Sequence, residues 1–248
     1  MKSRIALVTG AAKGIGLATS KKLISDGCHV VMVDRLPIDL SKLGISSNNA
    51  LAFSGDVSDA AFLLRLKEQI ESRLGTVSIL VNNAGISPKR PDGRSSGILE
   101  VTLDEWSKVL MINLTTVMQL SQLFLPGMQA QKFGRIVSLS SLAGRSKSVV
   151  AGPSYMASKA GVLGLMRAIA SEMGPFGITA NCVAPGRILT DMAMQAGEEV
   201  NRRYAEQIPV RRLGTAEEVA DAIAFLCAES SGFINGATID INGGFFMS

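Results

Sequence analysis

The sequence has very few residues that could bind a metal ion or form a disulfide bond. Three of its 248 residues are cysteine and one is histidine. The cysteines, Cys28, Cys182 and Cys227, lie far apart, and none belongs to a Cys-x-x-Cys pair. Because zinc sites use closely spaced cysteine and histidine ligands, we expect no metal site. A sparse, odd cysteine count is typical of a reducing compartment, which predicts a cytoplasmic protein.

Long apolar stretches and blocks of like charge are also missing. The first apolar run, residues 5–8, is too short for the core of a signal peptide, and we expect no stretch that could span a membrane. Basic residues exceed acidic ones by 25 − 21 = 4 and are scattered, which does not favour binding to nucleic acid. With 47% hydrophobic residues, residues 1–248 are predicted to form a single domain.

Short runs rich in β-branched residues recur along the chain, with helical patterning between them. The runs are residues 5–8, 30–33, 51–53, 79–81, 136–139, 178–183 and 238–241. Nearly continuous apolar strands that alternate with helices are typical of a parallel sheet covered on both faces. The sequence therefore predicts an α/β fold: a doubly wound, Rossmann-type parallel sheet of about seven strands with helices on both faces.

Local signals mark where several helices begin and end. Thr102 and Thr215 are each followed three residues later by glutamate, which is the pattern of a capping box. Gly27 follows a helical stretch as a stop signal. The link between the second and third strands is short, so we expect only a turn or two of helix around residues 40–43.

Two longer segments, residues 86–100 and 186–214, leave the carboxyl ends of predicted strands. In open parallel sheets the loops at these ends surround the ligand crevice. The second segment holds five arginines, and we expect it to be a substrate loop.

A glycine-rich turn directly follows the first predicted strand. Gly10, Gly14 and Gly16 precede a helical segment, in the spacing Gly-x-x-x-Gly-x-Gly. Glycines at such a turn let the backbone approach a pyrophosphate that lies on the N-terminus of the next helix. The spacing differs from the Gly-x-Gly-x-x-Gly fingerprint, and a turn that serves backbone geometry alone is the alternative.

Asp34 ends the second predicted strand, about 20 residues beyond the glycine turn, where a carboxylate can accept hydrogen bonds from the adenosine ribose. A carboxylate there repels a 2′-phosphate, which favours NAD over NADP. Lys13 and Arg35 could instead pair with that phosphate, or they could be solvated surface charges.

The third and fourth predicted strands also end in residues suited to a ligand. Asp56 and Val57 follow the third strand, and Asn82-Asn83-Ala84-Gly85 follows the fourth. Small residues after a strand allow a ligand to approach closely, although adjacent asparagines could simply form a turn.

The chain has two tyrosines, and one of them, Tyr155, is followed four residues later by Lys159. Positions i and i+4 share one helix face, so an ammonium could favour the phenolate of a group whose ordinary pKa is ~10. Ser141 ends a strand at the same edge and could bind a substrate oxygen. Asn113 lies in an otherwise apolar helix, where a structural role is as plausible as a functional one.

Together and in this order, these motifs resemble the short-chain dehydrogenase/reductase family along essentially the whole chain. They are the glycine turn, Asp34, Asn82-Asn83-Ala84-Gly85, Asn113, Ser141, Tyr155/Lys159 and Pro185-Gly186. The resemblance implies that Tyr155 is the general acid/base, that Lys159 lowers its pKa and holds the nicotinamide ribose, that Ser141 orients the carbonyl and that Asn113 anchors a water in a proton relay. The predicted cofactor-binding residues are Gly10, Lys13, Gly14, Ile15, Gly16, Asp34, Arg35, Asp56, Val57, Asn83, Ala84, Gly85, Tyr155, Lys159, Pro185, Gly186, Ile188 and Thr190.

Three functions are compatible with these residues. The first is hydride transfer between NAD(H) and a small secondary alcohol or ketone of the polyol, sugar or hydroxy-acid type. The second is reduction of 3-oxoacyl groups on acyl-carrier protein with NADPH, a reaction of similar enzymes, although Asp34 is unsuited to NADPH and residues 174–177 lack a basic side chain for an acidic carrier. The third, a non-catalytic dinucleotide sensor, is disfavoured by the full catalytic set.

Basic residues in the two crevice loops suggest a substrate with an anionic group, although most of them could be solvated. They are Lys89, Arg90, Arg94, Arg187, Arg202 and Arg203. The resemblance also implies a homotetramer, and the apolar helix surfaces at residues 114–125 and 163–169 could serve either the subunit interface or the core.

Overall fold

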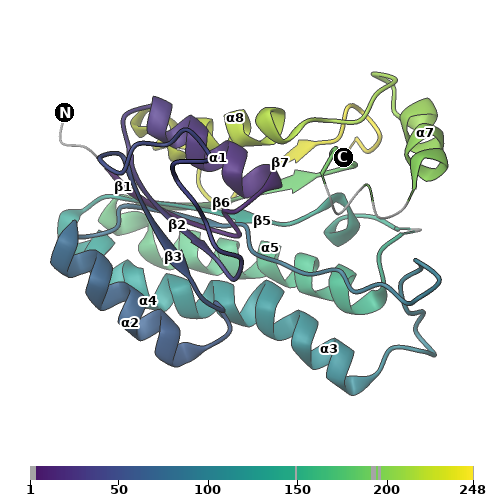
Figure 1. Cartoon of the computed structure of the whole chain (residues 1–248), viewed down its shortest axis with the longest axis horizontal. Coiled ribbons are helices and arrows are strands. Elements are labelled where there is room, and N and C mark those ends of the chain that lie inside the picture. Colours follow the sequence, from purple (N-terminus) through teal and green to yellow (C-terminus); the bar gives the residue numbers. More distant parts are fainter. Residues whose placement is uncertain (1–3, 149, 191–193, 195–196, 248) are drawn as a thin grey trace.

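The computed structural model describes residues 4–148, 150–190, 194 and 197–247. Seven parallel strands form one sheet in the order β3-β2-β1-β4-β5-β6-β7 (Figure 1). The strands are β1 (Ile5–Thr9), β2 (His29–Asp34), β3 (Ala50–Ser54), β4 (Ile79–Asn82), β5 (Gly134–Leu139), β6 (Ile178–Pro185) and β7 (Thr238–Ile241). Each predicted run corresponds to one strand, which confirms the predicted fold.

The strand order creates a crevice at the centre of the sheet. The chain builds outward from β1 to β3, then returns to place β4 against the free side of β1, pairing Leu7 with Leu80. The connections that follow β1 and β4 therefore leave the sheet in opposite directions. A ligand binds at the carboxyl ends of the strands where the order reverses in this way.

Helices cover both faces of the sheet (Figure 1). They are α1 (Gly14–Ser25), α2 (Ala60–Arg73), α3 (Leu103–Leu110), α4 (Thr116–Gln131), α5 (Pro153–Met173) and α8 (Ala216–Cys227). A further helix, α7 (Glu198–Gln207), lies beyond the sheet at one end of the molecule (Figure 1). Side chains of β1 alternate between two cores: Leu7 packs with residues of α2, α4 and α5, whereas Ala6 and Val8 pack with residues of α1 and α8. Residues 114–125 and 163–169 both supply side chains to the first core.

The predicted helix ends are formed only in part. Thr215 and Glu218 make a complete capping box at the start of α8. At α3 the Thr102 hydroxyl accepts a hydrogen bond from the Glu105 N–H, but the Glu105 carboxylate accepts from the hydroxyls of Ser96 and Ser154 instead. Residues 40–44 form hydrogen-bonded turns rather than the predicted helix.

The helix Leu103–Gln131 is long and apolar enough to cross a membrane by length and composition, contrary to our expectation from the sequence. It joins α3 and α4 through a π-helical turn, Met111–Thr115. Core helices of soluble proteins pass the same test, and Leu120, Phe124 and Met128 of this helix are buried in the core beneath the sheet.

The predicted substrate loop contains a helix that the sequence analysis missed. α7 lies within residues 186–214. Val200, Tyr204 and Ile208 have helical spacing, but the other side chains are mostly polar and the segment was assigned as a loop. Both ends of the segment are fixed, because Leu189 N–H donates to the Gly214 carbonyl and Gly214 N–H donates to the Arg187 carbonyl. Residues 191–193 and 195–196 of the predicted loop lie outside the described residues.

Candidate active site

A cavity of about 450 Å³ opens at the carboxyl ends of the central strands. Its lining includes every predicted site residue except Gly16 and Asn113: Gly10, Lys13, Gly14, Ile15, Asp34, Arg35, Asp56, Val57, Asn83, Ala84, Gly85, Ser141, Tyr155, Lys159, Pro185, Gly186, Ile188 and Thr190. It also includes residues that the site prediction missed, among them Ser140, Leu142, Tyr204 and Phe245. The structure thus brings together groups that are distant in the sequence.

The glycine turn is packed too tightly for side chains. Gly10 and Gly14 have positive φ angles of 66° and 55°. A Cβ at Gly16 would lie 2.1 Å from the Gly10 carbonyl oxygen, so Gly16 supports the turn from beneath instead of lining the cavity. The first turn of α1 has no side-chain cap, which leaves its N–H groups available to an anion. The turn therefore fits a pyrophosphate.

Gly16→Ala is expected to weaken NADH binding at least about tenfold, because the new methyl group would push the Gly10 backbone into the cavity. Fluorescence titration with NADH measures the change. Gly164→Ala is the matched control, since a Cβ there meets no atom within 4 Å. Equal NADH affinity in the two variants would contradict the packing argument.

Asn83 holds the glycine turn in place. Its amide nitrogen donates to the carbonyl oxygens of Thr9 and Gly10, both at 2.9 Å. The Thr9 hydroxyl accepts hydrogen bonds from the N–H groups of Asn83 and Ala84, both at 3.1 Å. Asn83 therefore lines the cavity while its amide nitrogen binds the turn, and its predicted contact with a cofactor stays a prediction.

Asp34 lies at the end of β2 with its carboxylate fixed by two backbone groups. Oδ2 accepts from Ala12 N–H and Oδ1 accepts from Leu36 N–H, both at 3.0 Å. Each carboxylate oxygen can accept a further bond, so Asp34 retains acceptor capacity on the cavity wall for ribose hydroxyls. Lys13 and Arg35 line the same cavity.

Asp56 and Val57 follow β3 on the same cavity wall. The N–H and the hydroxyl of Ser58 both donate to Asp56 Oδ1, at 2.8 and 2.6 Å. These hydrogen bonds lower the pKa of Asp56. Val57 packs into the core beneath the sheet, so its backbone position is well fixed.

The opposite wall begins after β6. Gly186 N–H donates to the Ile241 carbonyl at 2.9 Å, which ties the chain to β7. The side chain of Ile188 is buried in the core shared with α1 and α8. Thr190 reaches the glycine turn, because a Cβ added to Gly14 would lie 3.5 Å from its methyl group.

Tyr155, Lys159 and Ser141 meet where α5 packs against the end of β5. The Lys159 ammonium donates to the Leu139 carbonyl at 2.6 Å, and the Ser140 hydroxyl donates to the Lys159 carbonyl at 2.8 Å. Lys159 Nζ lies 5.7 Å from the centre of the Tyr155 ring. α5 is therefore anchored to β5 at the turn that carries both side chains.

Burial shifts the pKa values of Tyr155 and Lys159. Burial raises the pKa of Tyr155, and a hydrogen bond with Ser141 opposes that rise. Burial also lowers the pKa of Lys159 to about 8. Desolvation is the largest cause of both shifts, and the lowering of the Tyr155 pKa by Lys159 stays a prediction. The protonated phenol is the form suited to donate a proton to a carbonyl.

The lowered pKa of Lys159 predicts a change of stability with pH. Between about pH 8 and the ordinary pKa of 10.5, the unfolded chain binds more protons at Lys159 than the folded chain. The contribution of Lys159 to the free energy of unfolding therefore rises with pH in this window. That contribution is lost as the pH falls through about 8. The unfolding free energy of wild type relative to Lys159→Met should rise by on the order of 3 kcal/mol across this window.

Urea denaturation at several pH values between 7 and 10.5 measures this difference. Lys21→Met, at an exposed position on α1, is the control. A difference between wild type and Lys159→Met that stays constant with pH would contradict the lowered pKa.

Asn113 lies on the π-helical turn and does not line the cavity. Its Oδ1 accepts from Ile86 N–H at 2.8 Å, while Nδ2 donates to the Ile86 carbonyl and to the Ser158 hydroxyl, both at 3.0 Å. Ser158 in turn donates to the Tyr155 carbonyl at 2.8 Å. Asn113 therefore links the loop after β4 to the turn of α5 that carries Tyr155 and Lys159. Its role in a proton relay stays a prediction.

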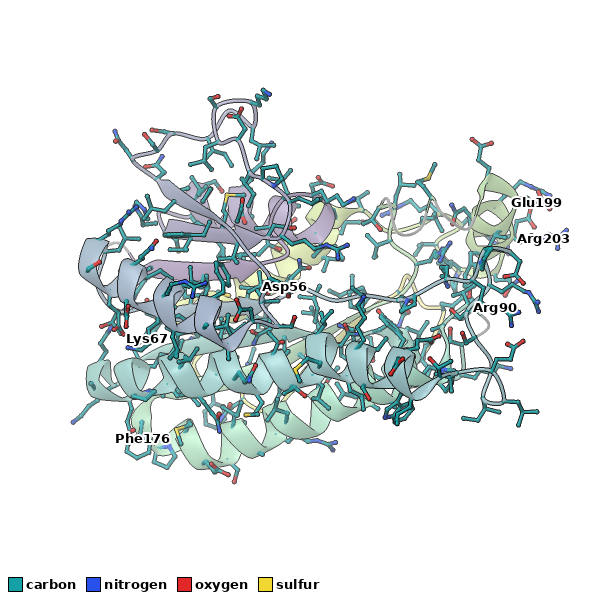
Figure 2. The ribbon with its side chains drawn as sticks, turned by 60° about the horizontal axis from the view of Figure 1, so that its bottom comes forward. Asp56, Lys67, Arg90, Phe176, Glu199 and Arg203 are labelled. Atoms are coloured by element: carbon teal, nitrogen blue, oxygen red, sulfur yellow. The ribbon has the colours of Figure 1, made fainter. Side chains whose placement is uncertain are left out.

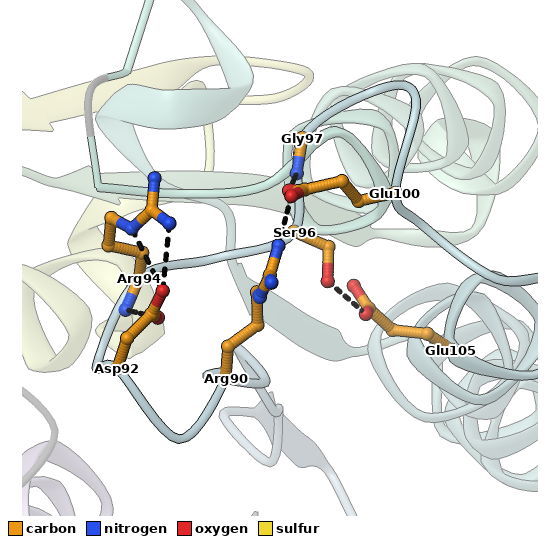
Figure 3. Close-up of polar contacts among 7 residues, drawn as sticks. All are labelled: Arg90, Asp92, Arg94, Ser96, Gly97, Glu100 and Glu105. Carbon is orange, nitrogen blue, oxygen red and sulfur yellow. Dashed lines mark hydrogen bonds and ion pairs between the residues drawn. The ribbon is translucent and has the colours of Figure 1, made fainter.

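Of the six basic residues considered for an anionic substrate, four form exposed ion pairs. Arg90 pairs with Glu100 and Arg94 with Asp92 (Figure 3). On α7, Arg202 and Arg203 both pair with Glu199, and Figure 2 shows Glu199 and Arg203 at the outer end of the molecule. Only the other two, Lys89 and Arg187, line the cavity.

Comparison with known proteins agrees with this geometry. The chain matches the family described as enoyl-(acyl carrier protein) reductase over residues 10–246. A 3-oxoacyl-(acyl-carrier-protein) reductase from Haemophilus influenzae is 36% identical over 256 residues and covers 100% of each chain. An acetoacetyl-CoA reductase from Shinella zoogloeoides is 38% identical over 246 residues, covering 99% of each.

A solved structure is similar along the whole chain. It is a 3-oxoacyl-(acyl-carrier protein) reductase from Brucella melitensis with bound NAD, 35% identical, with a TM-score of 0.88. The match covers 100% of this chain and 92% of that one. Sequence and structure therefore relate this chain to the same group of proteins.

Proposed function

The chain belongs to the short-chain dehydrogenase/reductase family of oxidoreductases that act on CH–OH groups, and we propose that it transfers a hydride between NAD(H) and a secondary alcohol or its ketone. The observation that carries this proposal is the position of Tyr155, Lys159 and Ser141 on the same cavity as the glycine turn and Asp34. A proton donor and a dinucleotide cradle in one cavity are what the reaction requires.

The cofactor preference is inferred from the carboxylate of Asp34. The glycine turn would hold the pyrophosphate, and Asp34 would accept from the adenosine ribose hydroxyls and repel a 2′-phosphate. The related protein from Brucella melitensis has NAD bound. Lys13 and Arg35 would favour NADP if their attraction for a 2′-phosphate exceeded its repulsion by Asp34.

The reaction divides between the cofactor and the residues around the carbinol carbon. The nicotinamide ring, when bound, supplies or accepts the hydride. In the reducing direction the carbonyl carbon gains that hydride with its electron pair, and the carbonyl oxygen takes the proton of the Tyr155 hydroxyl. Ser141 would orient the carbonyl, and Lys159 would stabilise the tyrosinate that remains. Oxidation of the alcohol returns the proton to Tyr155.

Reduction of 3-oxoacyl thioesters is a second candidate, favoured by the names of two relatives and of the solved structure. Absorbance at the nicotinamide wavelength tests both, with NAD(H) and NADP(H) against alcohols, polyols, sugar acids and 3-oxoacyl thioesters. We expect turnover with NAD(H). Tight cofactor binding without turnover of any compound would instead favour the non-catalytic sensor.

A further inference from the structure

Two of the cationic side chains that line the cavity come from the predicted crevice loops. Lys89 comes from the segment after β4 and Arg187 from the segment after β6, and both line the cavity together with Tyr155. The other basic residues of these loops that were considered for an anionic substrate do not line the cavity. Lys89 and Arg187 are thus distinguished by position from Arg90, Arg94, Arg202 and Arg203.

The contacts of Lys89 fix its ammonium without neutralising it. Its Nζ donates to the Ser95 hydroxyl at 2.9 Å and to the Val150 carbonyl. The Ser95 hydroxyl also donates to the Val150 carbonyl at 2.9 Å, which closes a small network. Both hydrogen-bond partners are neutral, so the positive charge stays directed to the cavity wall in a half-buried position.

The guanidinium of Arg187 is also held in place. Its Nε donates to Asn201 Oδ1 at 3.0 Å, and its central carbon lies 5.3 Å from the centre of the Tyr204 ring. Tyr204 contacts Phe245, with 5.8 Å between ring centres, and both aromatic residues line the cavity. A guanidinium held in this way keeps its positive charge at the cavity wall, where it can attract a carboxylate.

The two charges also affect each other. Burial lowers the pKa of each side chain, and the positive charge of Arg187 lowers the pKa of Lys89 further. Holding two like charges together in a partly buried cavity costs free energy, and a bound anion offsets that cost. Such arrangements are typical of functional sites.

We propose that the substrate is a small hydroxy acid or oxo acid whose free carboxylate binds between Lys89 and Arg187, while its carbinol or carbonyl group faces Tyr155. This inference rests on the proposed hydride transfer and names its substrate class. It also separates the two candidate reactions, because the acyl carbon of a thioester carries no negative charge for these cations to bind.

Matched substrate pairs test the proposal. Wild type is assayed with 2-hydroxy, 3-hydroxy and aldonic acids, with the methyl ester of each acid, and with a neutral N-acetylcysteamine 3-oxoacyl thioester. We expect kcat/KM to be at least about tenfold higher for the preferred acid than for its ester. Arg187→Met should lower kcat/KM for that acid about 10–100-fold, mainly through KM, and leave the ester nearly unchanged.

Control variants separate binding of the carboxylate from general effects of charge. Lys89→Met should act in the same direction as Arg187→Met, and Arg187→Lys should restore part of the activity on the acid. Arg203→Met and Arg90→Met each remove one charge from the same two loops, at ion-paired surface positions. They should leave kcat/KM unchanged for both the acid and its ester. The NADH dissociation constant of Arg187→Met should match wild type, because the proposal assigns Arg187 to the substrate.

The outcomes distinguish this inference from the proposed function. If wild type turns over the esters or the thioester at least as well as the acids, the proposed carboxylate site is wrong. The proposed hydride transfer is not affected by that result. Equal losses on acid and ester in Arg187→Met, or weaker NADH binding, overturn the carboxylate site as well. Wild type that oxidises or reduces no compound with either cofactor overturns both proposals.

Discussion

Tyr155→Phe is expected to lower kcat by about 10²–10⁴-fold while leaving the NADH dissociation constant nearly unchanged. The substitution removes only the phenolic hydroxyl, so the ring still packs beside Lys159 and Ser141. Because burial raises the pKa of Tyr155, the phenol is protonated at neutral pH and is ready to donate to a carbonyl oxygen. Without that hydroxyl, the alkoxide formed by hydride addition has no adjacent proton donor.

Tyr204→Phe is the matched control for this prediction, because Tyr204 is the other tyrosine of the chain and lines the same cavity. We expect it to retain most of the wild-type kcat. Both variants are measured in two ways. Steady-state rates give the loss in kcat, and fluorescence titration with NADH gives the change in its dissociation constant. Substantial residual turnover in Tyr155→Phe, or an equal loss in Tyr204→Phe, would remove Tyr155 from the proposed mechanism.

The sheet was predictable because its central strands β1, β2 and β4 are largely apolar on both sides. Leu7 faces one layer of helices while Ala6 and Val8 face the other, so the run has no polar alternation. The site followed from the same pattern, since the carboxyl ends of parallel strands meet at one edge. Asp34 and Ser141 could therefore be assigned to one crevice although they are distant in the sequence.

Contacts made by irregular backbone were not predictable in the same way. Asn113 was recognised as unusual, but its bonds to Ile86 and Ser158 depend on a π-helical turn for which no sequence pattern was evident. The helix α7 was missed because its apolar stripe is only three residues long, Val200, Tyr204 and Ile208, within a mostly polar segment. Gly16 was assigned to the cofactor by spacing, whereas the structure uses its small size to pack against the Gly10 carbonyl.

The basic residues show a further limit of sequence reasoning. Charge alone grouped Arg90 and Arg203 with Lys89 and Arg187. Whether a surface cation is paired depends on which carboxylate the fold brings to it, such as Glu100 for Arg90. Only the structure separated the cations of the cavity from those of the surface.

Asp34→Asn is expected to reverse much of the cofactor preference, changing the ratio of kcat/KM for NAD to that for NADP by about 10²–10³-fold. The amide keeps the size of the carboxylate and one of its acceptor oxygens. It loses the charge-assisted hydrogen bonds proposed for the ribose hydroxyls, which lowers kcat/KM for NAD. It also removes the repulsion of a 2′-phosphate, so Lys13 and Arg35 can favour NADP.

This substitution also removes one acceptor from the turn, because Asp34 Oδ1 and Oδ2 each accept from a backbone N–H. Asp39→Asn is the control for loss of a carboxylate charge. The backbone N–H groups of Ser41 and Lys42 both donate to Asp39 Oδ1, so the amide can keep these two bonds, and Asp39 does not line the cavity. Thermal denaturation of both variants shows how much stability is lost with the acceptor, and kinetics with both cofactors show the change in preference. A wild type that already prefers NADP, or an Asp34→Asn variant that loses activity equally with both cofactors, would mean that Asp34 supports the turn without selecting the cofactor.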